Sequence, residues 1–251
     1  MEFFQKATIL NRYTVAYFWC RNCGFLQTEE PYWLEEAYQE SINKSDTGIL
    51  SRNLYLSKFV SVVLYFYFDR GGKFLDFAGG YGILTRLMRD IGFDFYWSDP
   101  YTNNLFAKGF EYTEDLSNIE LITSFESFEH FVDPIEEIEN MLKISKNIFF
   151  TTQLLPNPIP KLNKWWYYGL EHGQHISFYS LKTLNFIAGQ YSLNLCSYGV
   201  NHLFTKQKMG QNIFRILSKA NRFGLSTFVK KRMRSKTFDD MNIVISKLNA
   251  E

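Results

Sequence analysis

A short glycine-rich turn, between an apolar run and a helical pattern, is the sequence feature that most restricts the fold of this chain. The turn, Ala78-Gly79-Gly80-Tyr81-Gly82, follows apolar residues 74–77 and precedes apolar residues at helical spacing over 83–88. This order predicts a strand, a tight turn and a helix. Because glycine has no Cβ, backbone N–H groups at the start of such a helix can approach a ligand closely. The sequence therefore predicts a site for a nucleotide-like ligand at this turn.

Two carboxylates narrow the choice of ligand. Asp76 lies two residues before the turn, and Asp99 follows a second expected strand over 93–97. An acid at the end of the second strand can accept ribose hydroxyls, and an acid before the turn can bind an ammonium group. A dinucleotide fingerprint would require glycine where Thr85 stands. The pattern favours S-adenosylmethionine, which carries both groups; the alternative is an ordinary α/β turn with an incidental surface aspartate.

With this turn and the acid after the second strand, the chain resembles the class I S-adenosylmethionine-dependent methyltransferases. Two further segments, Phe-Glu-Ser-Phe-Glu-His-Phe-Val-Asp-Pro at 125–134 and Gly-Gln-His-Ile-Ser-Phe-Tyr-Ser at 173–180, resemble a bacterial group associated with surface-polysaccharide and sugar biosynthesis. The resemblance implies a doubly wound, Rossmann-like α/β fold with a mostly parallel, seven-stranded sheet. The cofactor-binding residues that it implies are Asp76, Ala78, Gly79, Gly80, Tyr81, Gly82, Asp99, Pro100, Tyr101, Phe125 and Glu126.

The chain of 251 residues is long enough for one α/β domain with small additions. We expect an N-terminal extension over 1–45, a cofactor-binding domain over 46–207 and a helical tail over 208–251. Cys20 and Cys23 of the extension form a single CxxC pair, which supplies only half of a tetrahedral zinc site. We therefore expect no metal site. Within the central domain, a short helix over 103–109 and a short strand over 110–113 are also expected.

The acceptor side is expected around residues 165–180, where rings, an acid and two imidazoles stand close together. Aromatic faces suit sugar rings, and a neutral imidazole can remove a hydroxyl proton near neutral pH. His175 is the leading candidate for a general base, and His130 and Glu171 are further candidates. The alternative is that these histidines are structural and bind backbone carbonyls. Methyl transfer can also proceed by alignment of the reactants without a base.

Charge and composition limit the partners. The 27 basic and 26 acidic residues balance, so no overall field favours nucleic acid. A basic cluster at 230–236 is either a solvated helix face or an attraction for an anionic membrane or for the phosphates of a nucleotide-linked sugar. No secretory signal is recognised, so a cytoplasmic protein is expected. The last helix could pack on the body or on a second copy, which leaves a homodimer open.

These observations predict an S-adenosylmethionine-dependent methyltransferase. The resemblance implies a small-molecule or glycan acceptor, methylated at a hydroxyl of a sugar or sugar-containing intermediate. Two alternatives belong to other classes. A non-catalytic binding module could retain the fold, and an NAD-dependent oxidoreductase could use the glycine turn, although Thr85 breaks its fingerprint.

Overall fold

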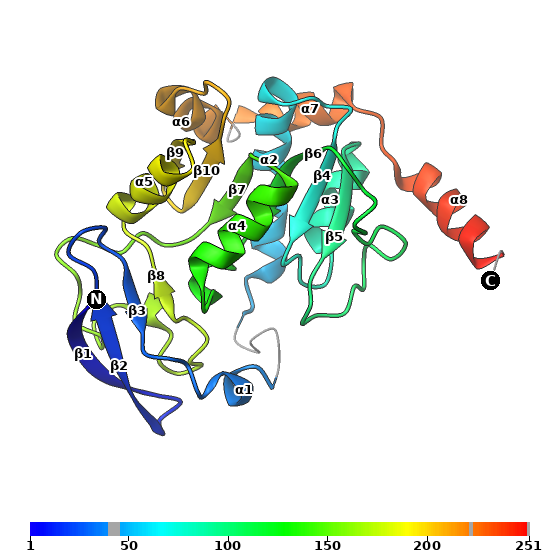
Figure 1. Cartoon of the computed structure of the whole chain (residues 1–251). Helices are drawn as coiled ribbons and strands as arrows, with labels where there is room; N and C mark the ends of the chain where they lie inside the picture. The colour runs from blue at the N-terminus through cyan, green and yellow to red at the C-terminus, as the bar shows by residue number, and fades with distance from the viewer. Residues whose placement is uncertain (40–45, 221–222, 250–251) are drawn as a thin grey trace.

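The computed structural model describes residues 1–39, 46–220 and 223–249, which form two sheets and the helices around them (Figure 1). The larger sheet has the strand order β5-β4-β6-β7-β10-β9. Strands β4, β5, β6 and β7 are parallel, whereas β10 runs antiparallel to both of its neighbours. This arrangement confirms the mostly parallel, Rossmann-like α/β fold. The six strands are β4 (Lys73–Phe77), β5 (Asp94–Ser98), β6 (Ile119–Ser124), β7 (Ile148–Thr151), β9 (Asn194–Tyr198) and β10 (Asn201–Thr205).

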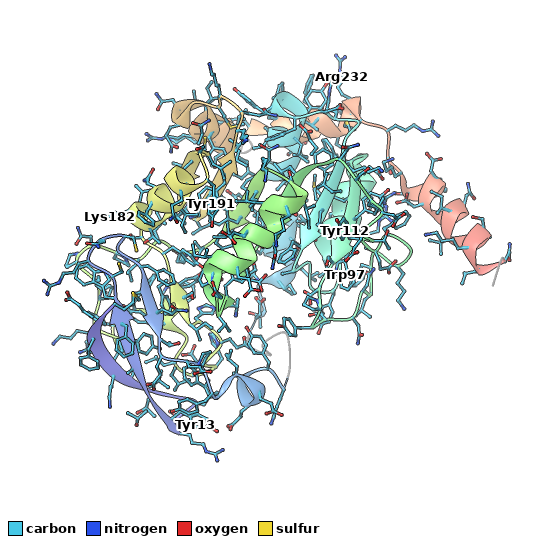
Figure 2. The ribbon with its side chains drawn as sticks, in the orientation of Figure 1. Tyr13, Trp97, Tyr112, Lys182, Tyr191 and Arg232 are labelled. Carbon is cyan, nitrogen blue, oxygen red and sulfur yellow. The ribbon has the colours of Figure 1, made fainter. Side chains whose placement is uncertain are left out.

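The prediction of seven strands is wrong, because the strand expected over 110–113 does not form. There, only Glu111 makes an isolated bridge to Trp97, whose backbone makes two hydrogen bonds of 2.9 and 2.7 Å to this segment (Figure 2). The Glu111 carboxylate also accepts a hydrogen bond of 2.7 Å from the Asn104 amide. This local link holds 103–109 as a loop, so the expected short helix is absent as well.

Helices cover both faces of the larger sheet. On one face, α2 (Ile49–Tyr67) and α3 (Ile83–Ile91) contribute buried residues to the same apolar core as α6 (Gln211–Ala220) and α7 (Leu225–Arg232). On the other face, α4 (Pro134–Ile144) and α5 (Leu181–Gln190) pack in a second core. This two-sided covering is the doubly wound arrangement predicted from the sequence, and it buries the near-continuous apolar runs of the parallel strands.

Two helices begin at the N-cap residues that the sequence predicts. The Asp133 side chain accepts hydrogen bonds from the backbone N–H groups of Ile135 and Glu136 at the start of α4, and Pro134 occupies the first turn. Ser180 caps α5 in a reciprocal arrangement with Thr183. Both predicted starts are confirmed, and they fix the points at which the chain leaves the ligand edge of the sheet.

A second sheet lies beyond the carboxyl ends of the parallel strands (Figure 1). It is antiparallel, with β1 (Glu2–Ile9), β2 (Tyr13–Trp19), β3 (Leu26–Thr28) and β8 (Ser177–Phe178) in that order. A short helix, α1 (Leu34–Ala37), follows β3. β8 lies within residues 165–180, where the acceptor side is expected. Residues 1–28 therefore form one sheet with that segment. The predicted boundary at residue 45 falls outside the described residues.

The last helix, α8 (Thr237–Leu248), is anchored by a buried ion pair. The guanidinium of Arg89 donates to both carboxylate oxygens of Asp240 at 2.8 and 2.7 Å, and both side chains are almost fully buried. Lys236 N donates to Arg89 O at the end of α3, which lies at the amino ends of the strands. The basic cluster at 230–236, with Arg232 labelled in Figure 2, is therefore at the end of the sheet opposite the glycine turn.

Within the three described ranges, no helix is both long and apolar enough to cross a membrane.

Candidate functional site

The glycine turn joins β4 to α3 through backbone conformations that disfavour residues with a Cβ atom. Gly80 and Gly82 have φ values of +53° and +81°, and Ala78 also has a positive φ, of 55°. A Cβ added at Gly79 would lie 2.7 Å from a Trp97 ring carbon, and one at Gly82 would lie 2.7 Å from an Asn104 oxygen. Glycine is thus favoured at Gly80 and Gly82 by the positive φ, and at Gly79 and Gly82 because a Cβ would clash with a neighbouring side chain. Both features are expected for a loop that brings its backbone close to a ligand.

Asp76 is buried directly behind this turn, with 2% of its surface exposed. Its carboxylate accepts hydrogen bonds from the Thr85 hydroxyl at 3.0 Å and the Thr123 hydroxyl at 2.8 Å. Burial raises the pKa of Asp76 to about 7, with a smaller contribution from Asp99, while the two hydroxyls lower it. A cationic ligand group beside this carboxylate would stabilise its charged form.

Asp99 is held against the turn from the neighbouring strand. One carboxylate oxygen accepts from Gly80 N at 2.9 Å, and the other accepts from the backbone N–H groups of Tyr101 and Thr102. The predicted pair of acids is therefore brought to the two sides of one loop. Pro100 is exposed, and Tyr101 is 80% exposed with its ring stacked on Tyr38 at 6.2 Å.

The end of β6 contributes the last two predicted cofactor residues. Glu126 adopts a left-handed backbone with φ of 53°, and its carboxylate accepts from the Thr151 hydroxyl at 2.7 Å. The Arg52 guanidinium lies 3.7 Å from the other Glu126 oxygen and also pairs with Asp46 at 2.6 Å. Phe125 is half-buried and packs edge-on against a ring of β7. All the predicted cofactor residues thus lie at the carboxyl ends of β4, β5 and β6, where open α/β sheets bind ligands.

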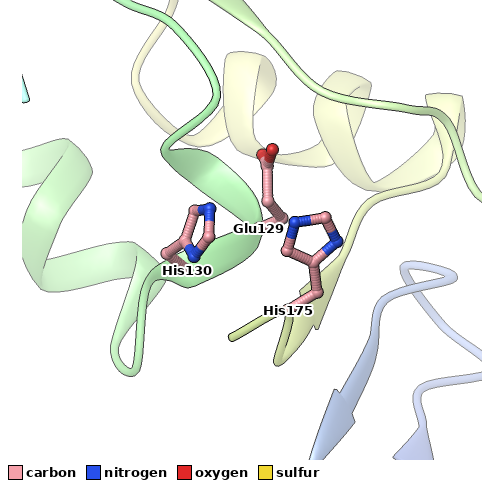
Figure 3. A group of neighbouring side chains, drawn as sticks. All are labelled: Glu129, His130 and His175. Atoms are coloured by element: carbon pink, nitrogen blue, oxygen red, sulfur yellow. The ribbon is translucent and has the colours of Figure 1, made fainter. Parts of the chain in front are cut away.

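Two of the predicted catalytic residues meet a third, unpredicted one at the junction of the two sheets. Glu129 and His130 come from a short turn, η1 (Phe128–His130), after β6, and His175 comes from the loop before β8 (Figure 3). One carboxylate oxygen and one nitrogen from each ring lie within 4.8 Å of one another. We call these three residues the junction triad. Ile176 N donates to Glu129 O at 2.9 Å, which ties the loop before β8 to η1.

Glu129 is 1% exposed, and its Oε2 atom has no hydrogen-bond partner among the described residues. Burial raises the pKa of Glu129 to about 8, and the negative charge of Glu126 adds to this effect. The hydroxyls of Tyr167 and Thr152 lower the pKa but do not cancel the cost of burial. A buried carboxyl group of this kind is costly as an anion unless a cation or donor reaches it.

The two imidazoles of the triad are neutral and fixed in orientation. His175 Nδ1 lies 2.7 Å from Tyr167 O, and since a carbonyl can only accept, Nδ1 carries the proton and Nε2 has a free lone pair. His130 Nδ1 lies 3.1 Å from Gln174 O and 2.8 Å from the Tyr38 hydroxyl. A proton on Nδ1 is donated to the carbonyl and leaves Nε2 with a free lone pair, whereas the Tyr38 hydroxyl donates to Nδ1 in the other tautomer. Burial lowers the pKa of His130 to about 4 and that of His175 well below its usual range.

Glu171, the third predicted catalytic residue, is exposed and lies outside the junction triad. It lines a hollow of about 460 Å³ together with Trp165, Trp166 and neighbouring residues. The aromatic run that was expected to line the acceptor site is divided: Tyr167 and Tyr168 are buried in the core of the second sheet, whereas Trp166 is 73% exposed. Most of these rings therefore serve packing.

The CxxC pair has a structural explanation. Cys23 O accepts a hydrogen bond of 2.9 Å from Thr183 Oγ1, and a Cβ on the following residue, Gly24, would lie 2.5 Å from Ser180 Oγ. The turn thus packs closely on the start of α5. Hydrogen bonds from Cys23 lower the pKa of the Cys20 thiol. Among the described residues, the triad is the group of metal-compatible side chains that lies close enough together, and the cysteines are not part of it.

The sequence reasoning missed several residues that shape the site. Thr85 was considered only as a break in a dinucleotide fingerprint, although its hydroxyl binds Asp76. Glu129 is not among the candidate residues of the sequence analysis, yet its carboxyl group is buried. The available signal was its position between Phe128 and Phe131, which predicts burial on an apolar turn.

Comparisons with known proteins agree with this geometry. A model of the methyltransferase domain family matches residues 51–198. No curated protein matches the sequence. The plantazolicin methyltransferase BpumL in complex with SAH is similar over 80% of this chain and 90% of that chain, at 12% identity and a TM-score of 0.50. The magnesium protoporphyrin IX methyltransferase ChlM from Synechocystis PCC 6803 with bound SAH is similar over 68% of this chain and 90% of that chain, at 10% identity and a TM-score of 0.45.

Proposed function

Because this chain belongs to the methyltransferase domain family, we propose that it transfers a methyl group from S-adenosylmethionine to a hydroxyl group of a sugar or sugar-containing acceptor. The observation that carries the cofactor assignment is the pair of acids around the glycine turn. Asp76 is buried behind the turn and Asp99 binds its front through Gly80 N. This arrangement offers one carboxylate to an ammonium group and the other to ribose hydroxyls.

The residues fit the cofactor on independent grounds. Burial raises the pKa of Asp76, so a cation beside this carboxylate would stabilise its charged form, and the space beside Gly79 is too tight for any larger residue. When bound, S-adenosylmethionine supplies a methyl group whose C–S bond breaks, with its electron pair left on sulfur, as the acceptor oxygen forms the new O–C bond. The positive charge on sulfur would be stabilised by the acids at this edge of the sheet.

The acceptor is assigned to the junction triad, beside the end of β6. The neutral His175 ring presents a free Nε2 lone pair, which can accept the proton of the acceptor hydroxyl. His130 and Tyr38 form the adjoining wall through their 2.8 Å contact. The choice of a sugar rests on the sequence resemblance over 125–134 and 173–180. BpumL, which shares the fold, is a plantazolicin methyltransferase, so the fold does not restrict the acceptor.

Calorimetric titration with S-adenosylmethionine, S-adenosylhomocysteine and NAD tests the cofactor assignment. We expect the two adenosyl compounds to bind and NAD not to bind. Binding of NAD alone, or of none of the three, would contradict the proposal. Turnover of S-adenosylmethionine with a panel of nucleotide-linked sugars, free glycans and phenols then tests the acceptor, and turnover restricted to phenols would exclude the sugar assignment.

A His175→Ala variant separates the base from the cofactor site. We expect turnover to fall about 100-fold with cofactor affinity unchanged, since general bases contribute factors of this size. His172→Asn is a matched control, because His172 lies next to His175 but outside the triad. Equal loss in both variants would indicate a structural role for this loop.

A further inference from the structure

The junction triad has the composition and the placement of a metal site. Two imidazoles and one carboxylate are common ligands of divalent transition metals, and three protein ligands leave positions open for a substrate oxygen. The three ligand atoms lie within 4.8 Å of one another. Ligands at metal bond lengths of about 2.0–2.2 Å lie roughly 3.0–3.5 Å apart, so closing the triad needs side-chain shifts of about 1 Å.

The hydrogen bonds around the triad resemble those that hold metal-binding histidines. In metal sites, the non-ligating ring N–H usually donates to a carbonyl or carboxylate and so fixes the ring. His175 Nδ1 donates to Tyr167 O at 2.7 Å, and His130 Nδ1 lies 3.1 Å from Gln174 O. When each ring carries its proton on Nδ1, both Nε2 atoms present free lone pairs. A general base would require only one ring in this state, whereas a metal uses both.

Charge around the triad also favours a cation. Glu129 Oε2 is buried without a hydrogen-bond partner among the described residues. The guanidinium of Arg52 faces Glu126 at 3.7 Å and is bound by Asp46 at 2.6 Å. Within the described residues, no ion pair reaches the Glu129 carboxyl group, and a divalent ion would neutralise its charge on binding.

We propose that Glu129, His130 and His175 bind one divalent transition-metal ion, of the class represented by Zn²⁺, Mn²⁺ and Co²⁺. This differs from the sequence-based expectation of no metal site. The site lies between the cofactor edge of the larger sheet and the second sheet, where the acceptor is assigned. Its role rests on the proposed function: with the ion bound, the Nε2 lone pair of His175 would be a ligand and no longer a base. An acceptor hydroxyl bound to the ion would then lose its proton to solvent water more readily, because the positive charge stabilises the oxygen anion.

Metal titration of the full chain tests the site. A Cys20→Ser, Cys23→Ser background removes thiolate ligands, and the protein is treated with a chelator that is then removed. Co²⁺ absorption spectra and calorimetry with Zn²⁺ and Mn²⁺ are recorded. We expect about one equivalent to bind and the affinity to fall at least about tenfold in Glu129→Gln and in His175→Ala. His172→Asn is the control, since its side-chain oxygen can still accept from Gln174 N as His172 Nδ1 does, and its affinity should not change.

Binding of S-adenosylhomocysteine is measured on the same samples to report on folding and on the cofactor site. Absence of metal binding in the Cys20→Ser, Cys23→Ser background, or equal affinity in the triad variants and the control, would overturn the metal proposal while cofactor binding stays intact. Conversely, metal binding without any cofactor binding would reject the proposed function and leave the metal site standing. An Asp76→Asn variant should lose the cofactor and keep the metal, which separates the two sites within one chain.

Discussion

Replacing Asp76 with asparagine is expected to stabilise the free protein and to abolish cofactor binding. The carboxylate is buried and has a pKa raised from 3.8 to about 7, mainly by burial. A raised acid pKa means that the folded state holds the proton more tightly than the unfolded state. The folded chain therefore loses stability as pH rises from the unfolded pKa to the folded one. Asparagine has the same shape and carries no such cost.

The magnitude follows from the pKa shift of Asp76. A shift from 3.8 to about 7 corresponds to about 4 kcal/mol of destabilisation at alkaline pH, at about 1.4 kcal/mol per unit. Part of this cost is already present at about pH 5, and the remainder, about 2.5 kcal/mol, develops between about pH 5 and about pH 8. The stability difference between Asp76→Asn and the wild type should widen by that amount over this range.

Denaturant unfolding at a series of pH values measures this difference, because other titrating groups cancel between the two proteins. Asp239→Asn is the control: Asp239 is largely exposed and pairs with the exposed Arg234, so its effect should stay within about 0.5 kcal/mol at every pH. Calorimetry with S-adenosylhomocysteine measures how cofactor affinity depends on pH. In the wild type, affinity should rise about tenfold per pH unit below about pH 7 and level off above it, since the ammonium group needs the ionised carboxylate.

Two results would refute this reasoning. A stability difference that does not change with pH would show that Asp76 does not titrate as a buried group. Retention of cofactor affinity in Asp76→Asn would show that the carboxylate has no part in binding, and its burial would then require a purely structural explanation.

Three further substitutions test neighbouring features. Thr85→Val removes a hydroxyl that lowers the pKa of Asp76, so cofactor affinity at neutral pH should fall about fivefold and its pH midpoint should rise, as calorimetry across pH would show. Gly79→Ala places a Cβ 2.8 Å from Asp76 Oδ2 and should weaken the cofactor more than about tenfold in the same titration, with an unchanged circular dichroism spectrum. Asp240→Asn removes one of the two carboxylates that bind the buried Arg89, the other being Asp94 at 2.8 Å, and should cost about 2 kcal/mol in denaturant unfolding. Cofactor affinity should change less than about twofold, because this pair lies at the opposite end of the sheet.

Local signals allowed much of the fold to be predicted. The turn at 78–82, the cap at Asp133 and the cap at Ser180 are short-range features whose residue types restrict the backbone directly, and the structure forms each of them. The parallel strands were recognisable because both of their faces are buried, which gives continuous apolar runs. The residues predicted to bind the cofactor lie in or directly after the end of a strand that the pattern identified.

The predictions that are wrong concern regions whose structure depends on contacts between segments distant in the sequence. Nothing within residues 110–113 reveals that Glu111 binds Asn104 and leaves the sheet one strand short. Likewise, β8 has only two residues, and it becomes a strand because β3, far away in the chain, pairs with it. The sequence therefore predicted the parallel sheet and the glycine turn but not the second sheet, because that sheet forms by pairing between segments far apart in the chain.

The buried acids at this edge suggest why the acceptor side required that second sheet. Asp76 ends up buried through elements next to it in the fold, since Thr85 and Thr123 come from α3 and β6. The buried Glu129 lies where the loop before β8 binds η1, through a hydrogen bond from Ile176 N to Glu129 O. A buried carboxyl group without a partner lowers the stability of the fold. Such groups occur mostly at sites where their charge serves binding or catalysis. The same contact holds His175 beside Glu129. The second sheet thus helps to assemble the triad, in which Glu129 is buried and the two imidazoles are half-buried, and this burial strengthens any charge interaction made there.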